Sequence, residues 1–141
     1  MEKEKAERAS ADPAANADPM QISGGALAYL GDAVFETAVR RALVRTGISD
    51  PGKLNRLALD YVCAGKQSEA VDRLLPHLTP TEDALFKRGR NTGGKNHPKS
   101  ASMVEYRRAT GLEALFGGLF LQGELARIDE LFALAFPTPG V

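Results

Sequence analysis

Residues 27–40 constrain the fold most, because this segment has helical periodicity and a single acid in its most apolar part. Every residue from 27 to 35 except Asp32 is apolar or glycine. An unpaired carboxylate against a packed surface is costly, so Asp32 predicts a compensating partner. Residues 110–121 repeat the pattern, with Glu113 as the only ionisable side chain. Two lone acids on two apolar helices predict one shared site.

The remaining sequence also predicts helices. Apolar residues recur at spacings of three and four over residues 24–46, 53–64, 67–75, 80–90, 102–120 and 124–135. Capping-box patterns mark two of the expected starts, Thr79 with Glu82 and Ser102 with Glu105. No stretch alternates apolar and polar residues between hairpin turns. The sequence therefore predicts an all-α fold, a helical bundle.

The length of 141 residues fits one domain. Residues before position 19 contain no large apolar side chain after Met1, so residues 1–20 are predicted to be a disordered tail. We expect the folded domain at residues 21–136 and a C-terminal tail at 137–141. The single cysteine excludes an intrachain disulfide, and no segment has the pattern of a signal peptide or a membrane span. We therefore expect a cytoplasmic protein with no membrane partner.

Basic residues cluster between positions 87 and 108, although the whole chain has 18 basic and 18 acidic residues. Glu105 is the only acid in this segment. The residues alone leave two interpretations open, a solubilising surface and a patch that faces phosphate groups. The basic residues are Lys87, Arg88, Arg90, Lys95, Lys99, Arg107 and Arg108.

The two lone acids indicate a specific chemistry if their helices pack together. Two carboxylates in contact repel each other unless a cation lies between them or one acid is protonated. Magnesium is a suitable cation, because it takes one or two protein carboxylates together with waters and phosphate oxygens. Asp32 and Glu113 could instead serve as helix caps or ion-pair partners. Glu36 is explained more simply as the ion-pair partner of Arg40, four residues later.

Four separated motifs, in this order, resemble the Mini-ribonuclease III family over residues 24–134. They are LAYLGDAVFETAVR (27–40), YVCAGKQ (61–67), FKRGRN (86–91) and EYRRATGLEALFGGLFL (105–121). The resemblance implies an all-α ribonuclease III catalytic domain without a separate double-stranded-RNA-binding domain. It also implies a homodimer that uses Mg2+, with Mn2+ as a substitute. Asp32 and Glu113 are then the catalytic residues and the metal ligands, with Glu36 and Glu105 around the metal.

The resemblance also implies the substrate, which is double-stranded RNA. The best-known family role is to mature the paired ends of the 23S ribosomal RNA precursor, with a ribosomal protein on the substrate as a further partner. An A-form duplex is held mainly through phosphates and 2′-hydroxyls, which suits the basic cluster. The residues expected to bind RNA are Arg88, Arg90, Asn91, Lys95, Lys99 and Arg107.

The sequence departs from full-length ribonuclease III at the positions of further acids, where it has Gly25, Ala28 and Thr110. Gly118 also stands where an aromatic residue is expected. One alternative function is a non-catalytic, dimeric RNA-binding or ribosome-binding protein on the same scaffold, and the presence of both acids argues against it. Another is an all-α nucleotide pyrophosphohydrolase, which would need an E-x-x-E cluster that is absent near Asp32.

Overall fold

The computed structural model describes residues 18–92 and 101–137. Within these ranges it contains helices and no strand, so the all-α prediction is confirmed. The elements are η1 (Pro19–Gln21), α3 (Gly24–Arg45), α4 (Pro51–Val62), α5 (Ala64–Leu74), η2 (Leu75–His77), α6 (Pro80–Arg90), α7 (Met103–Leu121) and α8 (Leu125–Ala135).

Local sequence signals explain where most of these helices begin. Both predicted capping boxes form, because the side chains of Thr79 and Ser102 accept from the backbone N–H of Glu82 and Glu105, which reach back in turn. The Asp50 side chain caps α4 by accepting from the backbone N–H of Lys53.

Several boundaries differ from the sequence prediction by one to three residues. Helix α5 begins at Ala64, three residues before the expected start, and Cys63 at its N-cap makes no side-chain hydrogen bond that would mark the position. The first described element, η1, falls partly in the segment assigned to the N-terminal tail; Asp18 caps this turn and Pro19 is buried. The described residues leave out 93–100, together with 1–17 of the predicted N-terminal tail and 138–141 of the predicted C-terminal tail.

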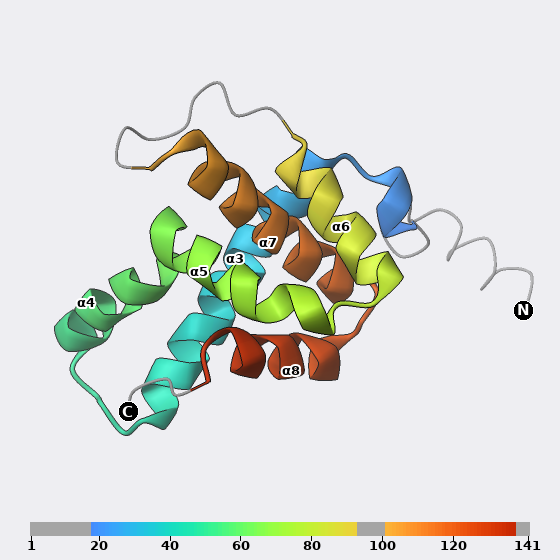
Figure 1. Cartoon of the computed structure of the whole chain (residues 1–141). Coiled ribbons are helices and arrows are strands. Elements are labelled where there is room, and N and C mark those ends of the chain that lie inside the picture. The colour runs from blue at the N-terminus through green and yellow to red at the C-terminus, as the bar shows by residue number, and fades with distance from the viewer. Residues whose placement is uncertain (1–17, 93–100, 138–141) are drawn as a thin grey trace, which may run out of the picture.

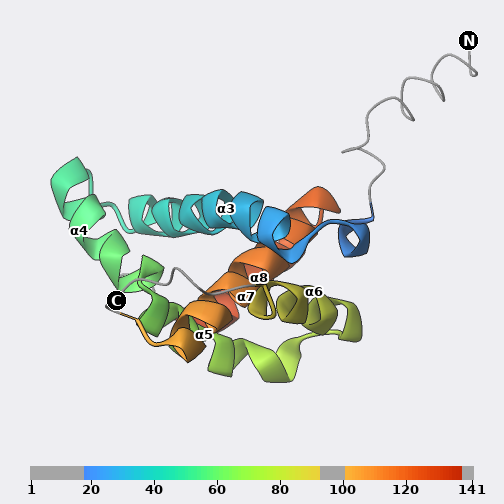
Figure 2. The same ribbon diagram turned by 90° about the horizontal axis from the view of Figure 1, so that it is seen from above.

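Helix α7 is the centre of the molecule. Figures 1 and 2 show it passing across α3, with α5 and α6 beside it and α4 at the far end of α3. The apolar side chains in its middle are almost fully buried, among them Leu112, Leu115 and Phe116. Phe116 meets Phe35 of α3 edge to face, with ring centroids 5.6 Å apart. The core therefore forms on both sides of α7, which fixes the relative positions of α3 and α6.

Glycines allow α6 and α7 to approach closely. A Cβ atom at Gly89 would lie 2.4 Å from the Cβ of Ala114, and one at Gly111 would lie 2.6 Å from the Phe86 ring. The same close packing explains the glycine at position 118, where a Cβ atom would lie 2.8 Å from the Leu85 side chain. Leu85 occupies the space that a larger residue at position 118 would need.

A buried ion pair joins α8 to α6. Arg127 donates to both carboxylate oxygens of Glu82, at 2.8 and 2.9 Å, and to the backbone carbonyl of His77 at 2.8 Å. The hydrogen bond from Arg127 lowers the pKa of Glu82 against the opposing effect of burial. Glu82 thus serves both as the capping-box residue of α6 and as the anchor of α8.

Candidate active site

The candidate site lies where α3 crosses α7, and two glycines set the distance between these helices. A Cβ atom at Gly31 would lie 1.6 Å from the backbone carbonyl oxygen of Glu113. One at Gly117 would lie 2.0 Å from the carbonyl oxygen of Leu27. The two backbones therefore touch, and no side chain separates them. Asp32, the neighbour of Gly31, is brought beside Glu113 by this contact.

Asp32 and Glu113 interact directly, as the two lone acids predicted. The pKa of Glu113 is raised to about 8, mainly by burial and further by the hydrogen bond and the negative charge of Asp32. A carboxyl group that holds a proton up to this pH can share it with its neighbour. The structure therefore places two carboxylates from distant parts of the chain in one site, 81 positions apart in the sequence.

Burial is distributed differently from the sequence expectation. Asp32 was expected against a packed surface, but its side chain is exposed, while Glu113 is half-buried. The reason is that Gly31, and not Asp32, occupies the helix crossing. Asp32 is therefore accessible to a large substrate, with Glu113 behind it.

The donor set fits a hard divalent cation. Two carboxylates that otherwise share one proton can both ionise when a cation lies between them. No cluster of three or more acidic, histidine or cysteine side chains with metal-site geometry occurs among residues 18–92 and 101–137. Magnesium does not need such a cluster, because it keeps several waters and accepts phosphate oxygens of a substrate. Asp32 and Glu113 are thus the residues that could hold it.

Each of the two acids expected around the metal has a hydrogen-bond partner of its own. Glu36 forms an ion pair with Arg40 at 2.9 Å, as its spacing of four residues predicted. One oxygen of Glu105 accepts from the backbone N–H of Ser102 at 3.0 Å. Its other oxygen, Oε2, lies 3.3 Å from where a Cβ atom of Gly65 would stand, facing the start of α5.

The described part of the basic cluster lies at the end of α6 and on α7. Arg88 donates to the backbone carbonyl of Ile22, so its side chain helps to fasten η1 and the start of α3. Arg90 donates to the Asn91 side chain at 3.2 Å and lies over the Phe86 ring. Lys95 and Lys99 lie outside the described residues.

Arg107 and its neighbour Arg108 differ in their surroundings. Arg107 is exposed, and no hydrogen bond or ion pair of its side chain is found within the described chain. Arg108 is half-buried and forms an ion pair with Asp72 of α5. Within residues 18–92 and 101–137, the Arg107 guanidinium therefore has no partner that would compete with a phosphate group, whereas that of Arg108 has one.

A cavity of about 480 Å³ adjoins Glu113, between the start of α5 and the N-terminal half of α7. Gln67 lines it, and sequence reasoning did not single out this residue. A signal was present, because Gln67 shares the spacing of the buried Ala70, Val71 and Leu74 at intervals of three, four and seven. A polar residue on the buried stripe of a helix is a candidate for function.

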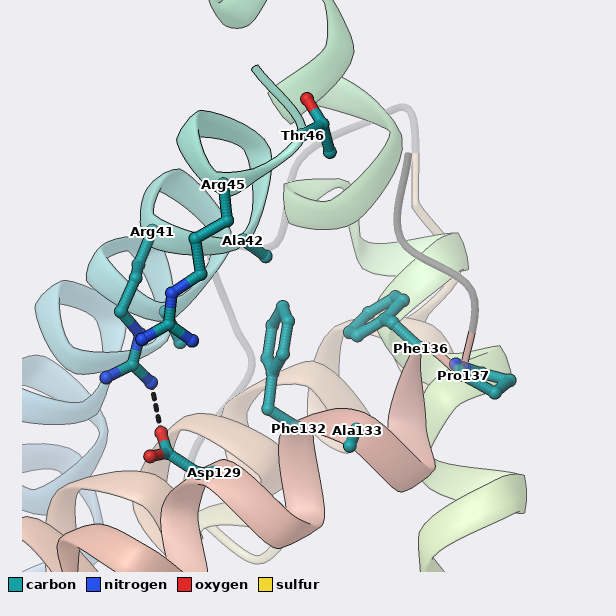
Figure 3. A pocket seen from close by; sticks show the side chains of 10 residues that line it. Arg41, Ala42, Arg45, Thr46, Asp129, Phe132, Ala133, Phe136 and Pro137 are labelled. Atoms are coloured by element: carbon teal, nitrogen blue, oxygen red, sulfur yellow. Dashed lines mark hydrogen bonds and ion pairs between the residues drawn. The ribbon is translucent and has the colours of Figure 1, made fainter. Parts of the chain in front are cut away.

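A second cavity, of about 540 Å³, lies away from the acids (Figure 3). Its walls are the C-terminal half of α3 and helix α8, with the rings of Phe132 and Phe136 on one side and Arg41 and Arg45 on the other. Arg41 pairs with Asp129 across it. Arg41 follows Asp32 by nine residues, or about 14 Å along a helix. This cavity is therefore separate from the acid pair.

Comparisons with known proteins agree with this geometry. A family model of the ribonuclease III domain matches residues 25–124, which include both acids. Mini-ribonuclease 3 of Symbiobacterium thermophilum is 42% identical over 119 residues, which cover 84% of this chain and 92% of the relative. This chain belongs to the Mini-ribonuclease III family. It is therefore an endoribonuclease of the ribonuclease III type.

Further Mini-ribonuclease III relatives and a solved structure support the assignment. Mini-ribonuclease 3 of Enterococcus faecalis is 40% identical over 116 residues, covering 81% of this chain and 88% of the relative. The crystal structure of a Fusobacterium nucleatum protein matches with a TM-score of 0.73 and 30% identity, covering 82% of this chain and 92% of that one. Enzymes of the ribonuclease III family act on double-stranded RNA and use a divalent metal ion.

The three positions without the expected acids have different surroundings. Ala28 is buried in the core, where a carboxylate would lack a partner. Gly25 is exposed at the start of α3. Thr110 lines the cavity beside Glu113, and its hydroxyl donates to the backbone carbonyl of Tyr106 at 2.9 Å.

In the described part of the chain, no helix is long and apolar enough to cross a bilayer.

Proposed function

We propose that this chain cleaves double-stranded RNA with Mg2+ held by Asp32 and Glu113. The observation that carries the proposal is the contact between these two carboxylates at the α3–α7 crossing. A divalent cation bound between the two carboxylates would explain why two apolar helices each have one acid at the same point. Membership of the ribonuclease III family supports the reaction type.

The bound ion supplies charge neutralisation at the phosphorus and polarisation of a water molecule, and Mn2+ can substitute for it. Asp32 contributes an accessible carboxylate at the rim of the site. Glu113 contributes a half-buried carboxylate whose position is fixed by the core around α7. This rigid support keeps the carboxylate oxygens of Asp32 and Glu113 at a fixed distance from each other when a long substrate binds.

We propose that the basic residues near the acid pair bind the RNA backbone. The end of α6 lies against the start of α3, where a Cβ atom at Gly24 would lie 2.2 Å from the carbonyl oxygen of Arg88. Arg90 and Asn91 stand at this end and Arg107 on α7, so all three can face the backbone of one duplex. Lys95 and Lys99 belong to the same proposal by sequence, and Arg88 contributes positive charge from its place beside Ile22.

We propose that the enzyme works as a homodimer, so that two sites cut the two strands. An apolar groove of about 360 Å³ between α3, the end of α7 and the first half of α8 supports this proposal. Leu30 and Val34 line it from α3, and Phe120 and Leu125 expose 45% and 57% of their surface beside it. An exposed apolar surface of this kind favours a protein partner, and a second copy of the chain is the partner that the family resemblance implies.

The proposed natural substrate is the paired end of the 23S ribosomal RNA precursor, cut in the cytoplasm with a ribosomal protein bound to the precursor. Support for this step comes from the family resemblance and from the likeness to Mini-ribonuclease 3 relatives.

A direct test is incubation of the purified protein with perfect duplex RNA, labelled on both strands, with and without Mg2+. We expect cuts in both strands only with the ion, and none in single-stranded RNA or duplex DNA of the same sequence. Binding of duplex RNA without any cleavage in Mg2+ or Mn2+ would instead support the non-catalytic alternative.

A further inference from the structure

The cavity beside Glu113 has the position of a substrate subsite. It lies between the start of α5, which contributes Gly65 and Gln67, and the face of α7 that carries Glu105, Thr110 and Glu113. Its volume of about 480 Å³ is in the range of small-ligand sites. Because Glu113 forms part of the wall, a group that enters the cavity comes next to the reacting phosphodiester. The inference therefore rests on the proposed function.

Gln67 gives this cavity an unused hydrogen-bonding group. Its residue is 5% exposed, and its side-chain amide makes no hydrogen bond within the described chain. The other buried polar residue, Glu82, has partners for its carboxylate in Arg127 and Thr79. A largely buried amide to which the described chain offers no partner needs a water molecule or a ligand to satisfy it.

The amide of Gln67 is nevertheless reachable. Among the described side chains, only Arg88 Nε is both sealed from solvent and without a hydrogen bond. The amide atoms of Gln67 therefore keep contact with open space. The open space at this residue is the cavity that it lines.

The charges around the cavity select the kind of group that fits. Glu105 and Glu113 line it, and no lysine or arginine of the described chain does. A phosphate group is disfavoured between two acids. A neutral group that both donates and accepts matches an amide, which also does both. In RNA the ribose 2′-hydroxyl is such a group, and it is the group that distinguishes RNA from DNA.

We propose that Gln67 is a substrate-positioning residue that binds the 2′-hydroxyl of a ribose next to the scissile phosphate. The contact holds the sugar in the cavity while Asp32 and Glu113 act on the neighbouring phosphodiester. It contributes to the preference for RNA over DNA at one defined nucleotide. The residue acts through the position of the substrate and takes no part in bond breaking.

The test combines a substrate series with a variant that removes the amide. Duplex RNAs with a single 2′-deoxy substitution at each position near the cut are cleaved by the wild type and by Gln67→Met, which is similar in length and apolar. We expect a deoxy substitution at one position to reduce the cleavage rate of the wild type about tenfold, the effect of one lost hydrogen bond. Gln67→Met should cleave the all-ribose substrate about tenfold more slowly than the wild type does. The deoxy substitution at that position should not reduce its cleavage rate further.

Controls separate this contact from a general loss of structure. Ser68→Ala changes the next residue, which does not line the cavity, and should keep the wild-type sensitivity. Gln67→Leu, which also removes the amide and is close in volume, serves as a second variant if Gln67→Met unfolds. The inference is overturned if the wild type has no sensitive deoxy position, or if the variants keep the full sensitivity. A wild type that cuts no duplex RNA would instead contradict the proposed function itself.

Discussion

At the scale of single residues, Glu113 has the most unusual environment in the described chain. Its carboxyl group is half-buried beside Asp32, and its pKa is raised to about 8. The unfolded chain has the ordinary value of 4.5. The folded state without metal therefore prefers the protonated form. This contribution to stability is fully present below about pH 4.5 and is lost as the pH rises through 8.

This shift predicts a pH-dependent difference between the wild type and Glu113→Gln, whose amide does not ionise. In the presence of a chelator, the free energy of unfolding of the wild type should fall relative to that of the variant between pH 5 and pH 8. Denaturant unfolding at several pH values measures the difference. Saturating Mg2+ should reduce the fall, because it stabilises the ionised pair. A difference that does not change with pH would contradict the proposed environment of Glu113.

At the scale of elements, the crossing of α3 and α7 determines whether the two acids meet. The contact requires glycine at position 31, because a Cβ atom there would overlap the backbone of Glu113 at 1.6 Å. Gly25 lies in the first turn of the same helix. A Cβ atom there would lie 3.5 Å from Cγ2 of Thr92, an ordinary van der Waals contact. The two glycines thus form a matched pair, one at the crossing and one in open surroundings.

Gly31→Ala should therefore separate the helices, lower the melting temperature by several degrees and reduce RNA cleavage at least about a hundredfold. Gly25→Ala should change neither property substantially. Thermal unfolding and single-turnover cleavage measure both effects. Wild-type cleavage by Gly31→Ala would show that the close crossing is not needed to form the site.

The neighbouring arginines of α7 provide a second comparison at this scale. Arg107 is exposed and lacks an ion-pair partner in the described chain, whereas Arg108 pairs with Asp72. Arg107→Gln should weaken binding of duplex RNA and reduce the slope of log affinity against log salt by about 1, since one phosphate contact is lost. Arg108→Gln should leave the slope unchanged. Equal slopes for the wild type and Arg107→Gln would remove Arg107 from the RNA-binding surface.

At the scale of the whole molecule, the apolar groove between α3, the end of α7 and the first half of α8 predicts a dimer. Replacing Leu125 by lysine places a charge in an exposed apolar position that is not part of the folded core. Analytical ultracentrifugation should show a dimer for the wild type and a monomer for Leu125→Lys, with unchanged helix content. A monomeric wild type at micromolar concentration would contradict the proposed homodimer.

The sequence predicted the helices well because their signals are local. The capping boxes at Thr79 and Ser102 fixed two helix starts to the residue. The start of α5 was missed because Cys63 provides no capping side chain. The two lone acids predicted a shared site, and the structure brings them together, although the catalytic role assigned to them stays a prediction.

The sequence did not predict which residue would lie at the crossing or which acid would be buried. A glycine in an apolar helix is seen as a weak point of that helix, and only the facing helix shows that Gly31 is the contact. Gln67 was missed for a similar reason. Its burial depends on α5 packing against α7, so its missing hydrogen bond becomes visible only in three dimensions.

The central claim is that Asp32 and Glu113 act as one site in the cleavage of duplex RNA, and single-turnover cleavage in Mg2+ tests it most directly. The variants are Asp32→Asn, Glu113→Gln and the double variant, with Asp60→Asn on α4 as the control acid. We predict that each single variant binds RNA but loses cleavage by at least about a thousandfold, and that the double variant loses no more, as for residues that act as a unit. Cleavage at the wild-type rate by either single variant would contradict the account.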